Sequence, residues 1–525
     1  MSQQSQTVLI TSASYVNAEL AAEFGRLPPA FLPFGHDRLF QRQVESIRTR
    51  AAGDDLRILL TLPASFTPAL WDAEWLDQAQ VEILKLPDGL SLAESIKSAL
   101  ILTDTRGPLG ILHGDTLFTS PIPAELDIVS VAATTDAYDW GHLSSGGTPE
   151  SATGRSLTGW FAFRSGADFL KSLAREADFT QALADYHRCF PMAEVDVGGW
   201  LDFGHLQTFY QARSKVSTAR SFNALSISGH SVLKAGGKPG KLDAEAAWFE
   251  EAPPHLRLYF PAFLGRERDG YRLAYEVSPT LHELYVFGAL GEHTWRQILA
   301  GCFDFLNVCA VTTGDPSSGT ERDLITQLVT TKTLDRLEQW SEARGSDLDQ
   351  EWTYGGKALP SLRRIADLTG SIALESKAIP GVMHGDFCFP NVFYNFRQGL
   401  IKVIDPRGSV VDGQPTFLGD IRYDLAKLNH SLQGYDLILA NRYSLSRGGR
   451  YDVQIEVAPT DASWRLFEIA RGFNINGQQL NDASITAMTI HMFLSMLPLH
   501  ADRPDRQDAF LANALRLFQT LDAAA

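Results

Sequence analysis

The feature that most limits the fold is an alternation of short apolar runs with amphipathic stretches in the first third of the chain. The apolar runs have the length and the β-branched or leucine-rich composition of strands, and the stretches between them repeat at helical spacing. The expected strands cover 7–12, 57–62, 81–86, 109–115 and 126–134, and the clearest expected helices cover 37–51 and 91–103. This pattern predicts an α/β domain with a mostly parallel sheet and helices on both faces. Ligands of such sheets bind at the carboxyl ends of the strands.

The pattern changes near residue 217, and at 525 residues the chain is too long for one compact core. The next segments predict a two-stranded ribbon, a helix and two further strands, over 221–236, 238–252, 256–265 and 271–278. From residue 291 the chain is mainly helical. We therefore expect an α/β domain over 1–216, a small β-rich lobe over 217–290 and a helical lobe over 291–525. A β-rich lobe followed by a larger helical one is the α+β organisation of protein-kinase-like phosphotransferases.

Composition and charge exclude several classes of protein. The formal net charge of −16 argues against non-specific binding of nucleic acid or anionic lipid, although a local phosphate site needs only a few cations or a metal. No apolar run reaches the roughly 18–20 residues that span a bilayer, and the N-terminal segment lacks the pattern of a signal peptide. Four cysteines are scattered without metal-ligand spacing. We expect a reduced, cytoplasmic protein.

The tripeptide His-Gly-Asp occurs twice, each time after a short apolar run. In its second occurrence Asp386 is followed five residues later by Asn391, and Asp405 ends an apolar run fourteen residues further on. Phosphoryl transfer to a hydroxyl uses one carboxylate to orient the acceptor and take its proton. It uses an amide and a second carboxylate to hold Mg²⁺ against the phosphates of ATP. The spacing therefore predicts a phosphotransferase site.

Upstream residues supply a matching nucleotide contact. Lys234 lies in an expected strand, where it could contact the α- and β-phosphates, and Glu245 lies eleven residues on in the expected helix. A Lys–Glu pair of this kind positions the lysine for the phosphates. Glu250 and Glu251 share the helix and are alternative partners.

Three motifs carry a resemblance to the aminoglycoside phosphotransferase and choline kinase superfamily: HGDFCFPNVFYN, IKVIDPRG and GDIRYDLAKL. It covers roughly residues 217–525. The resemblance implies ATP as phosphoryl donor, Asp386 as catalytic base, Asn391 and Asp405 as magnesium ligands, and Lys234 with Glu245 as the nucleotide-phosphate pair. It suggests structural roles for Asp420 and Asp424. Arg407 is expected to contact an anionic or polyhydroxylated acceptor, or to cap the strand.

The first His-Gly-Asp needs a different explanation, because no Asn follows Asp115 at the same distance and no small lobe precedes it. Here the chain resembles the nucleotidyltransferases that make nucleotide sugars and CDP-alcohols. The resembling stretches are PPAFLPFGHDRLFQRQVESI and GGWLDFGHLQTFYQA, and the second supplies Asp202. The resemblance covers roughly residues 5–216. It implies that Asp115 and Asp202 hold one Mg²⁺ on CTP or another nucleoside triphosphate while a sugar- or alcohol-phosphate attacks the α-phosphorus.

This region departs from the family at the glycine-rich phosphate loop, A-A-G-x-G-x-R. The chain reads TSASYVNAELAAEFGRL there, and only Gly25 and Arg26 match the end of the loop. Pro29 stands at the position of the family's lysine. Arg26 is therefore the cation expected at the nucleotide phosphates. A domain that binds a nucleotide without turning it over is the alternative.

Together the two regions predict a bifunctional enzyme. A kinase yields a phosphomonoester, and a nucleotidyltransferase consumes one and releases pyrophosphate. We expect an activated sugar, polyol or amino alcohol for surface-polysaccharide synthesis, because such fusions resemble capsule-biosynthesis enzymes. The expected partners are a small hydroxyl acceptor and nucleotides, and no oligomeric state follows from the sequence. The alternative is a kinase alone, with a degenerate N-terminal nucleotide-binding or assembly domain. Aminoglycoside resistance is disfavoured, since cationic drugs require an extended acidic pocket.

Overall fold

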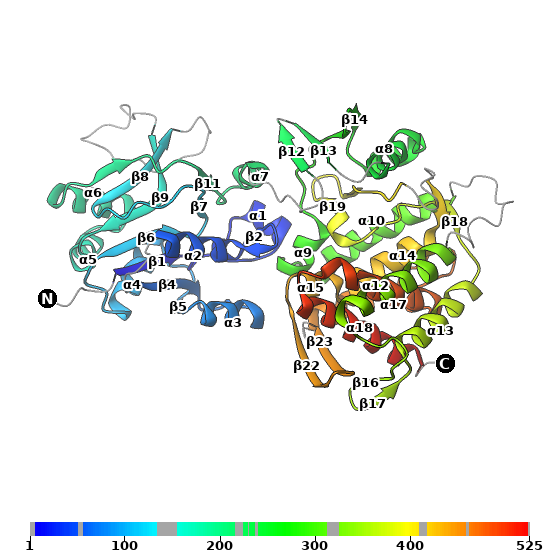
Figure 1. The fold of residues 1–525 in the computed structure, drawn as a ribbon. Coiled ribbons are helices and arrows are strands. Elements are labelled where there is room, and N and C mark those ends of the chain that lie inside the picture. Colours follow the sequence, from blue (N-terminus) through cyan, green and yellow to red (C-terminus); the bar gives the residue numbers. More distant parts are fainter. Residues whose placement is uncertain are drawn as a thin grey trace. The chain divides into compact units, whose positions relative to one another are not determined.

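The computed structural model describes residues 6–50, 56–133, 155–215, 224–228, 230–236, 240–311, 325–408, 417–457 and 461–522. The chain divides into two compact units, Met1–Val216 with Phe287–Ala289, and Ser217–Val286 with Leu290–Ala525 (Figure 1). The junction predicted at residues 216 and 217 lies outside the described residues. The boundary between the two lobes of the second unit, near residue 290, stays a prediction.

A seven-stranded sheet forms the centre of the first unit, in the order β10-β8-β9-β6-β1-β4-β5. Its strands are β1 (Gln6–Thr11), β4 (Leu56–Pro63), β5 (Val81–Leu86), β6 (Leu109–His113), β8 (Ile128–Ala133), β9 (Arg155–Phe163) and β10 (Ala193–Val195). Every neighbouring pair is parallel except the two that involve β9. The predicted mostly parallel α/β sheet is confirmed, with β9 as an antiparallel strand that the sequence pattern did not predict.

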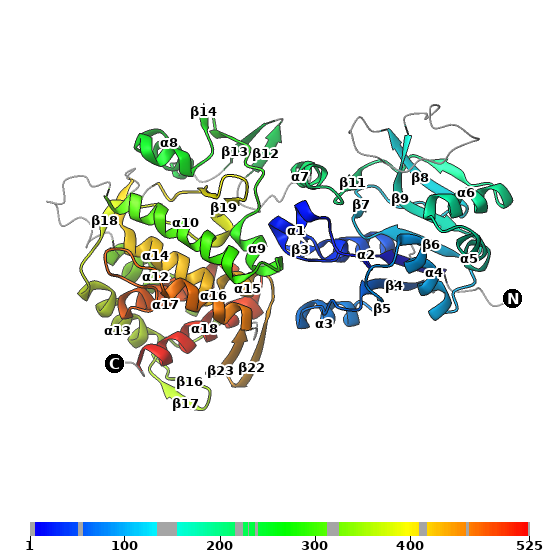
Figure 2. The ribbon, with the colours of Figure 1, turned by 180° about the vertical axis from the view of Figure 1, so that it is seen from behind.

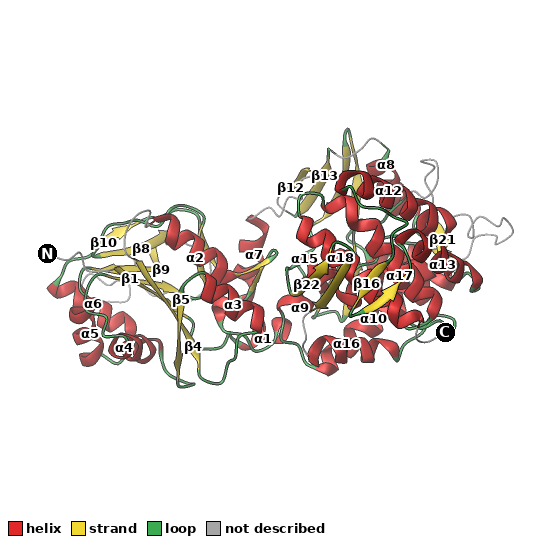
Figure 3. Cartoon of the chain, turned by 60° about the horizontal axis from the view of Figure 1, so that its bottom comes forward, coloured by secondary structure: helices red, strands yellow, loops and turns green. Residues whose placement is uncertain are grey.

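Helices cover both faces of this sheet, as predicted. Figure 3 shows α4 (Leu92–Leu102), α5 (Gly166–Arg175) and α6 (Phe179–Cys189) on one face, with α2 (Leu39–Arg50) and α3 (Leu70–Gln78) on the other. Ser91 and Glu94 form a capping box that fixes the start of α4. Buried side chains of α4, α5 and α6, such as Ile96 and Phe169, pack with Phe161 of β9 in one apolar cluster.

The second unit begins with an antiparallel sheet in the order β12-β13-β15-β14. Its strands are β12 (Ala224–Ser228), β13 (Ser231–Ala235), β14 (Phe263–Glu267) and β15 (Gly270–Ala274), and α8 (Lys241–Glu251) lies between β13 and β14 in the chain. The strand expected over 256–265 is wrong in its first half, where a 3₁₀ turn, η2 (Pro254–Tyr259), replaces it. Pro254 favours the first position of a helical turn, and Pro261 has no N–H to give a sheet.

The rest of the second unit is mainly helical. Its helices of ten or more residues include α10 (Glu292–Val311), α12 (Lys332–Arg344), α13 (Leu362–Glu375), α14 (Ile421–His430), α16 (Asp461–Arg471), α17 (Ala483–Met496) and α18 (Pro504–Asp522) (Figure 2). The central helix is α17, which carries no charged residue and packs against α12, α13, α14 and α18. A four-stranded sheet was not predicted: β16 (Trp352–Tyr354), β17 (Lys357–Leu359), β22 (Tyr443–Gly449) and β23 (Asp452–Val457). No helix among the described residues is long and apolar enough to cross a membrane.

Candidate active sites

A β-hairpin in the second unit brings Asn391 and Asp405 together. β19 (Val392–Asn395) pairs antiparallel with β20 (Leu400–Val403), with Val392 opposite Val403. Asn391 directly precedes the hairpin and Asp405 follows it, and the N–H of Ile404 donates to the carbonyl oxygen of Asn391 at 3.0 Å. The fourteen-residue spacing in the sequence is therefore the length of a hairpin with its flanking residues.

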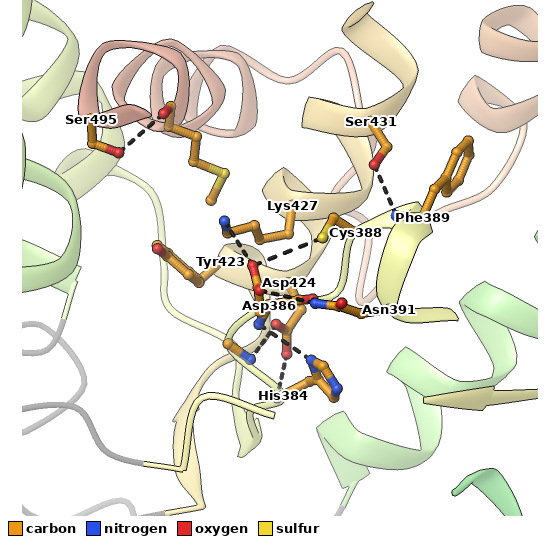
Figure 4. A network of polar contacts seen from close by, with 12 residues as sticks. His384, Asp386, Cys388, Phe389, Asn391, Tyr423, Asp424, Lys427, Ser431 and Ser495 are labelled. Carbon is orange, nitrogen blue, oxygen red and sulfur yellow. Dashed lines mark hydrogen bonds and ion pairs between the residues drawn. The ribbon is translucent and has the colours of Figure 1, made fainter. Parts of the chain in front are cut away.

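Asp386 lies beside Asn391 in the loop after β18 (Pro380–Val382). The amide nitrogen of Asn391 donates to Asp386 Oδ2 at 2.9 Å and to the Asp386 carbonyl oxygen at 3.0 Å. Lys427 Nζ lies 2.9 Å from Asp386 Oδ1, and 41% of the Asp386 side chain is exposed (Figure 4). Although burial opposes it, the Asp386 charge raises the pKa of Lys427. The carboxylate is thus held by two neighbours and still reachable by a small molecule.

Asp424 holds the loop that carries Asp386. The N–H groups of His384 and Gly385 each donate to one Asp424 carboxylate oxygen, both at 2.7 Å. Burial raises the pKa of Asp424 to about 7, and the two N–H donors oppose this. Gly385 has a φ of +78°, and a Cβ there would lie 2.6 Å from Arg407 Cβ. Both the left-handed backbone and the close approach require glycine at this position.

The Lys234 ammonium joins the small lobe to this site. Lys234 Nζ lies 2.6 Å from Glu245 Oε2 and 2.9 Å from Asp405 Oδ1. The side chains of Lys234 and Glu245 are only 6% and 1% exposed. Burial lowers the pKa of Lys234, but the charges of Asp405 and Glu245 outweigh it and raise the pKa above its usual value. Glu250 and Glu251 are exposed, so Glu245 is the glutamate of α8 that meets this lysine.

His384 is a buried scaffold residue in this geometry. Its Nδ1 lies 3.2 Å from the N–H of Asp386, and its ring packs edge-on against Trp248. Burial lowers the pKa of His384 to about 4, which keeps the imidazole neutral at physiological pH. A neutral, hydrogen-bonded imidazole orients the loop.

Sequence reasoning missed several neighbours of these residues. Lys427 follows Asp424 by one turn of α14, so both side chains lie on the helix face toward the Asp386 loop. This three-residue spacing in the sequence could have indicated Lys427. Tyr271 donates its hydroxyl to Glu245 Oε2 at 2.8 Å and pairs with Lys234 across β13 and β15. The place of Tyr271 beside Lys234 and Glu245 depends on strand register, which a single sequence does not reveal.

In the first unit, the pairing of two short strands brings Asp115 and Asp202 together. β7 (Thr116–Phe118) pairs antiparallel with β11 (Trp200–Asp202), with Asp202 opposite Thr116. Asp115 Oδ2 and Asp202 Oδ1 lie 2.7 and 3.3 Å from the point where a Gly204 Cβ would stand. The two carboxylates therefore face one small space, closer together than the separation of about 8 Å beyond which a single ion could not join them.

The electrostatics of this pair favour a cation. Burial and the charge of Asp115 raise the pKa of Asp202 to about 6, while Thr208 and His205 oppose the shift by hydrogen bonding. A cavity of about 270 Å³ adjoins the pair and is lined in part by His113, Trp200 and His205. Two mutually repelling carboxylates beside a cavity of mixed polar and apolar lining suit a divalent cation and a small anionic ligand.

The segment that replaces the glycine-rich loop forms a short capped helix, α1 (Ala18–Phe24). Asn17 caps it by accepting from the Leu20 N–H, and its side-chain nitrogen donates to the Gly204 carbonyl oxygen at 2.9 Å. Arg26 follows this helix, 70% exposed, with its guanidinium 3.9 Å from the Tyr15 ring centroid and 3.9 Å from Asp88 Oδ2. In the described residues its contacts are thus with Tyr15 and Asp88 rather than with the carboxylate pair.

Both sites offer the oxygen ligands that magnesium prefers. Within the described ranges, no group of three or more His, Cys, Asp and Glu side chains forms a metal site. Mg²⁺ is usually bound by one or two carboxylates together with phosphate oxygens and water, so two protein ligands at each site suit a nucleotide-bound magnesium.

Comparison with solved structures finds similarity to nucleotide-sugar pyrophosphorylases and to choline and ethanolamine kinases. No protein-family model and no curated protein matches the chain. A nucleoside-diphosphate-sugar pyrophosphorylase from Vibrio cholerae RC9 is 13% identical, with 39% of this chain and 99% of that chain covered and a TM-score of 0.33. A choline/ethanolamine kinase family protein from Mesorhizobium loti is 11% identical, with 58% and 85% covered and a TM-score of 0.33.

A Plasmodium vivax ethanolamine kinase is 9% identical, with 66% of this chain and 94% of that chain covered and a TM-score of 0.33. Similarities at this level do not assign an activity. The roles proposed below therefore rest on contacts between residues of this chain.

Proposed function

We propose that the chain is a bifunctional enzyme. Its second unit transfers the γ-phosphoryl group of ATP to a hydroxyl of a small molecule. Its first unit then joins the phosphomonoester to the nucleotidyl group of CTP or another nucleoside triphosphate and releases pyrophosphate. The observation that carries the proposal is the convergence of Lys234, Asp386 and Asp405, predicted from distant motifs, with their partners Glu245 and Asn391.

In the proposed phosphotransferase, Asp386 orients the acceptor hydroxyl and takes its proton as the oxygen attacks the γ-phosphorus. Asn391 and Asp405 would hold Mg²⁺, and the bound ion would neutralise charge on the phosphates. Asn391 directs its nitrogen to Asp386, which leaves its carbonyl oxygen for the metal. Lys234, positioned by Glu245, binds the nucleotide phosphates.

In the proposed nucleotidyltransferase, Asp115 and Asp202 would hold the cation of the nucleoside triphosphate, and the adjoining cavity would receive the phosphomonoester. Arg26 is the proposed phosphate contact of this unit. Two observations favour a second candidate, a kinase whose first unit only binds nucleotide or serves in assembly. Arg26 contacts Tyr15 and Asp88, and the helix α1 replaces the glycine-rich loop. Release of pyrophosphate from a nucleoside triphosphate separates the two candidates.

We propose an activated, nucleotide-linked metabolite as the product, for a surface polysaccharide such as a capsule. The four cysteines are free thiols, which suits the reducing cytoplasm where nucleoside triphosphates are available.

Substitution of Asp386 tests the kinase assignment. Asp386→Asn should lower phosphoryl transfer by about a hundredfold or more, because it removes the general base, while binding of ATP stays nearly intact. The measurement is ADP formation across a panel of choline, ethanolamine, hexoses, polyols and their acid or phosphate derivatives. Asp367→Asn, the same change at an exposed position of α13, is the matched control. Near-normal turnover of an accepted substrate by Asp386→Asn would refute the assignment.

A further inference from the structure

A group of basic side chains beside Asp386 has no part in the phosphotransferase steps above. Lys332 and Arg336 lie one turn apart on α12, and Arg407 follows the proposed metal ligand Asp405. We refer to Lys332, Arg336 and Arg407 as the cation cluster. Its members are half-buried and gather around the buried phenol of Tyr423.

Tyr423 links the cation cluster to the candidate site. Lys332 Nζ donates to Tyr423 Oη at 3.2 Å. Tyr423 stands one turn before Lys427 on α14, and Lys427 contacts Asp386. Figure 4 shows Tyr423 and Lys427 projecting from this helix beside Asp386. Contacts through Tyr423 and Lys427 therefore link the cation cluster to the proposed base.

Arg407 is fixed against the same loop. Its backbone N–H donates to the His384 carbonyl oxygen at 2.7 Å. Its side chain packs over Gly385, where an added Cβ would stand 2.6 Å from Arg407 Cβ and 3.2 Å from its Cδ. Arg407 thus covers the residue that directly precedes Asp386.

Within the cation cluster, Lys332 and Arg336 are electrostatically under-compensated. Burial, with the charges of Arg407, Lys427 and Arg336, lowers the pKa of Lys332 to about 8, and only Tyr423 opposes this. Burial raises the pKa of Tyr423, but the surrounding cations outweigh it and lower that pKa to about 8. Within the described part of the chain, neither Lys332 nor Arg336 forms an ion pair with a carboxylate. Repelling cations of this kind gain stability from a bound anion.

We infer that the phosphoryl acceptor carries an anionic group, a carboxylate or a phosphate, besides its reacting hydroxyl, and that Lys332 and Arg407 bind this group. The inference rests on the proposed kinase function and narrows its substrate class. An amino alcohol would bring a further positive charge to the cluster. The hydroxyl oxygen forms a bond to the γ-phosphorus, its proton passes to Asp386, and the bond to the β,γ-bridging oxygen breaks with its electron pair leaving on ADP.

The first test measures anion binding without turnover. Inorganic phosphate is titrated calorimetrically into the full chain saturated with Mg²⁺ and a non-hydrolysable ATP analogue, so that the nucleotide contacts are already occupied. Lys332→Met should weaken phosphate binding about tenfold or more, because it removes a charged hydrogen-bond donor to the anion. Lys332→Arg should retain it. Lys357→Met, on the exposed hairpin of β16 and β17, is the matched control. Equal phosphate affinity in wild type and Lys332→Met would overturn the inference.

The second test measures ADP formation with matched acceptors: glycerol, D-glycerate and sn-glycerol 3-phosphate; glucose, glucuronate and glucose 6-phosphate; and ethanolamine. The anionic members should be preferred, and comparison of acid with phosphate identifies the group. Lys332→Met should raise KM for the anionic acceptors about tenfold or more with kcat nearly unchanged, because binding alone is lost. Preference for neutral or cationic acceptors, with kinetics insensitive to Lys332, would overturn the inference and leave the kinase function standing. Lys332-dependent phosphate binding without ADP formation from any acceptor would instead refute the kinase function.

Discussion

Asp405, the second residue after β20, adopts a left-handed backbone with a φ of +58°. This conformation is uncommon outside glycine, and a short polar side chain tolerates it better than most. It places the Asp405 carboxylate 2.9 Å from Lys234 and beside the end of the hairpin that carries Asn391. The proposed magnesium ligands are therefore positioned by backbone geometry as well as by their chemistry.

Removal of either ligand gives a prediction at this scale. Asn391→Ala and Asp405→Ala should each raise the Mg²⁺ concentration for half-maximal ADP formation by about tenfold or more, because each removes one proposed oxygen ligand. Asp367→Ala, at the exposed control position of α13, should match wild type. Magnesium titrations of the two variants that superpose on the wild-type curve would mean that other residues bind the metal.

The sequence predicted which of the proposed site residues lie together where their spacing is set locally, and their roles stay a prediction. Asn391 and Asp405 flank one hairpin, and Asp202 follows a Trp that pairs across β11 and β7. Tyr271 and Lys332 were not predicted, because their contacts depend on strand register and on a side-chain hydrogen bond between α12 and α14. A single sequence carries no direct signal of such long-range contacts.

At the scale of elements, Gly408 governs how the loop after β20 meets α8. It has a φ of +65°, and an added Cβ would collide with the Ala244 carbonyl oxygen, one residue before Glu245. Gly399 has the same φ of +65° in the hairpin turn, but a Cβ there would meet nothing within 4 Å. Alanine at either position would be strained by the left-handed backbone, but only alanine at position 408 would also collide with a neighbouring atom.

Gly408→Ala should therefore displace α8 from the loop and weaken ATP binding, whereas Gly399→Ala should show only the strain of a left-handed alanine, about 1–2 kcal/mol. The measurements are ATP affinity by calorimetry and the unfolding temperature of both variants. Equal ATP affinity in the two variants would show that contact between α8 and the loop does not position Lys234 and Glu245.

Element prediction succeeded where local signals agree and failed where they conflict. The amphipathic spacing of α4 and the short apolar runs of β1, β4, β5 and β6 identified those elements. The run over 256–265 is apolar like a strand, but Pro253 and Pro254 just before it favour a 3₁₀ turn over residues 254–259. The sheet of β16, β17, β22 and β23 escaped prediction because its two hairpins lie far apart in the sequence.

At the scale of the whole molecule, each compact unit contains one pair of proposed metal ligands and the neighbours that orient them. The α/β and α+β classes followed from the order of predicted elements, because connection rules leave few arrangements for alternating strands and helices. Activity of the first unit could not be predicted in the same way. Its carboxylates meet as expected, but α1 replaces the loop that would identify a nucleotide-phosphate site.

³¹P NMR of a single reaction mixture shows whether two successive reactions occur on one chain. Wild-type chain with Mg²⁺, ATP, CTP and an accepted hydroxyl substrate should form the phosphomonoester first and then the nucleotide-linked product with pyrophosphate. Asp115→Asn and Asp202→Asn should stop at the phosphomonoester, and the double variant should be little worse than either, because the two carboxylates act as one unit. Asp386→Asn should form the nucleotide-linked product only when the phosphomonoester is supplied. Loss of kinase activity in the Asp115 variant would contradict the proposal of two successive reactions. It would also be contradicted if the wild-type chain, given the phosphomonoester that it makes, released no pyrophosphate from any nucleoside triphosphate.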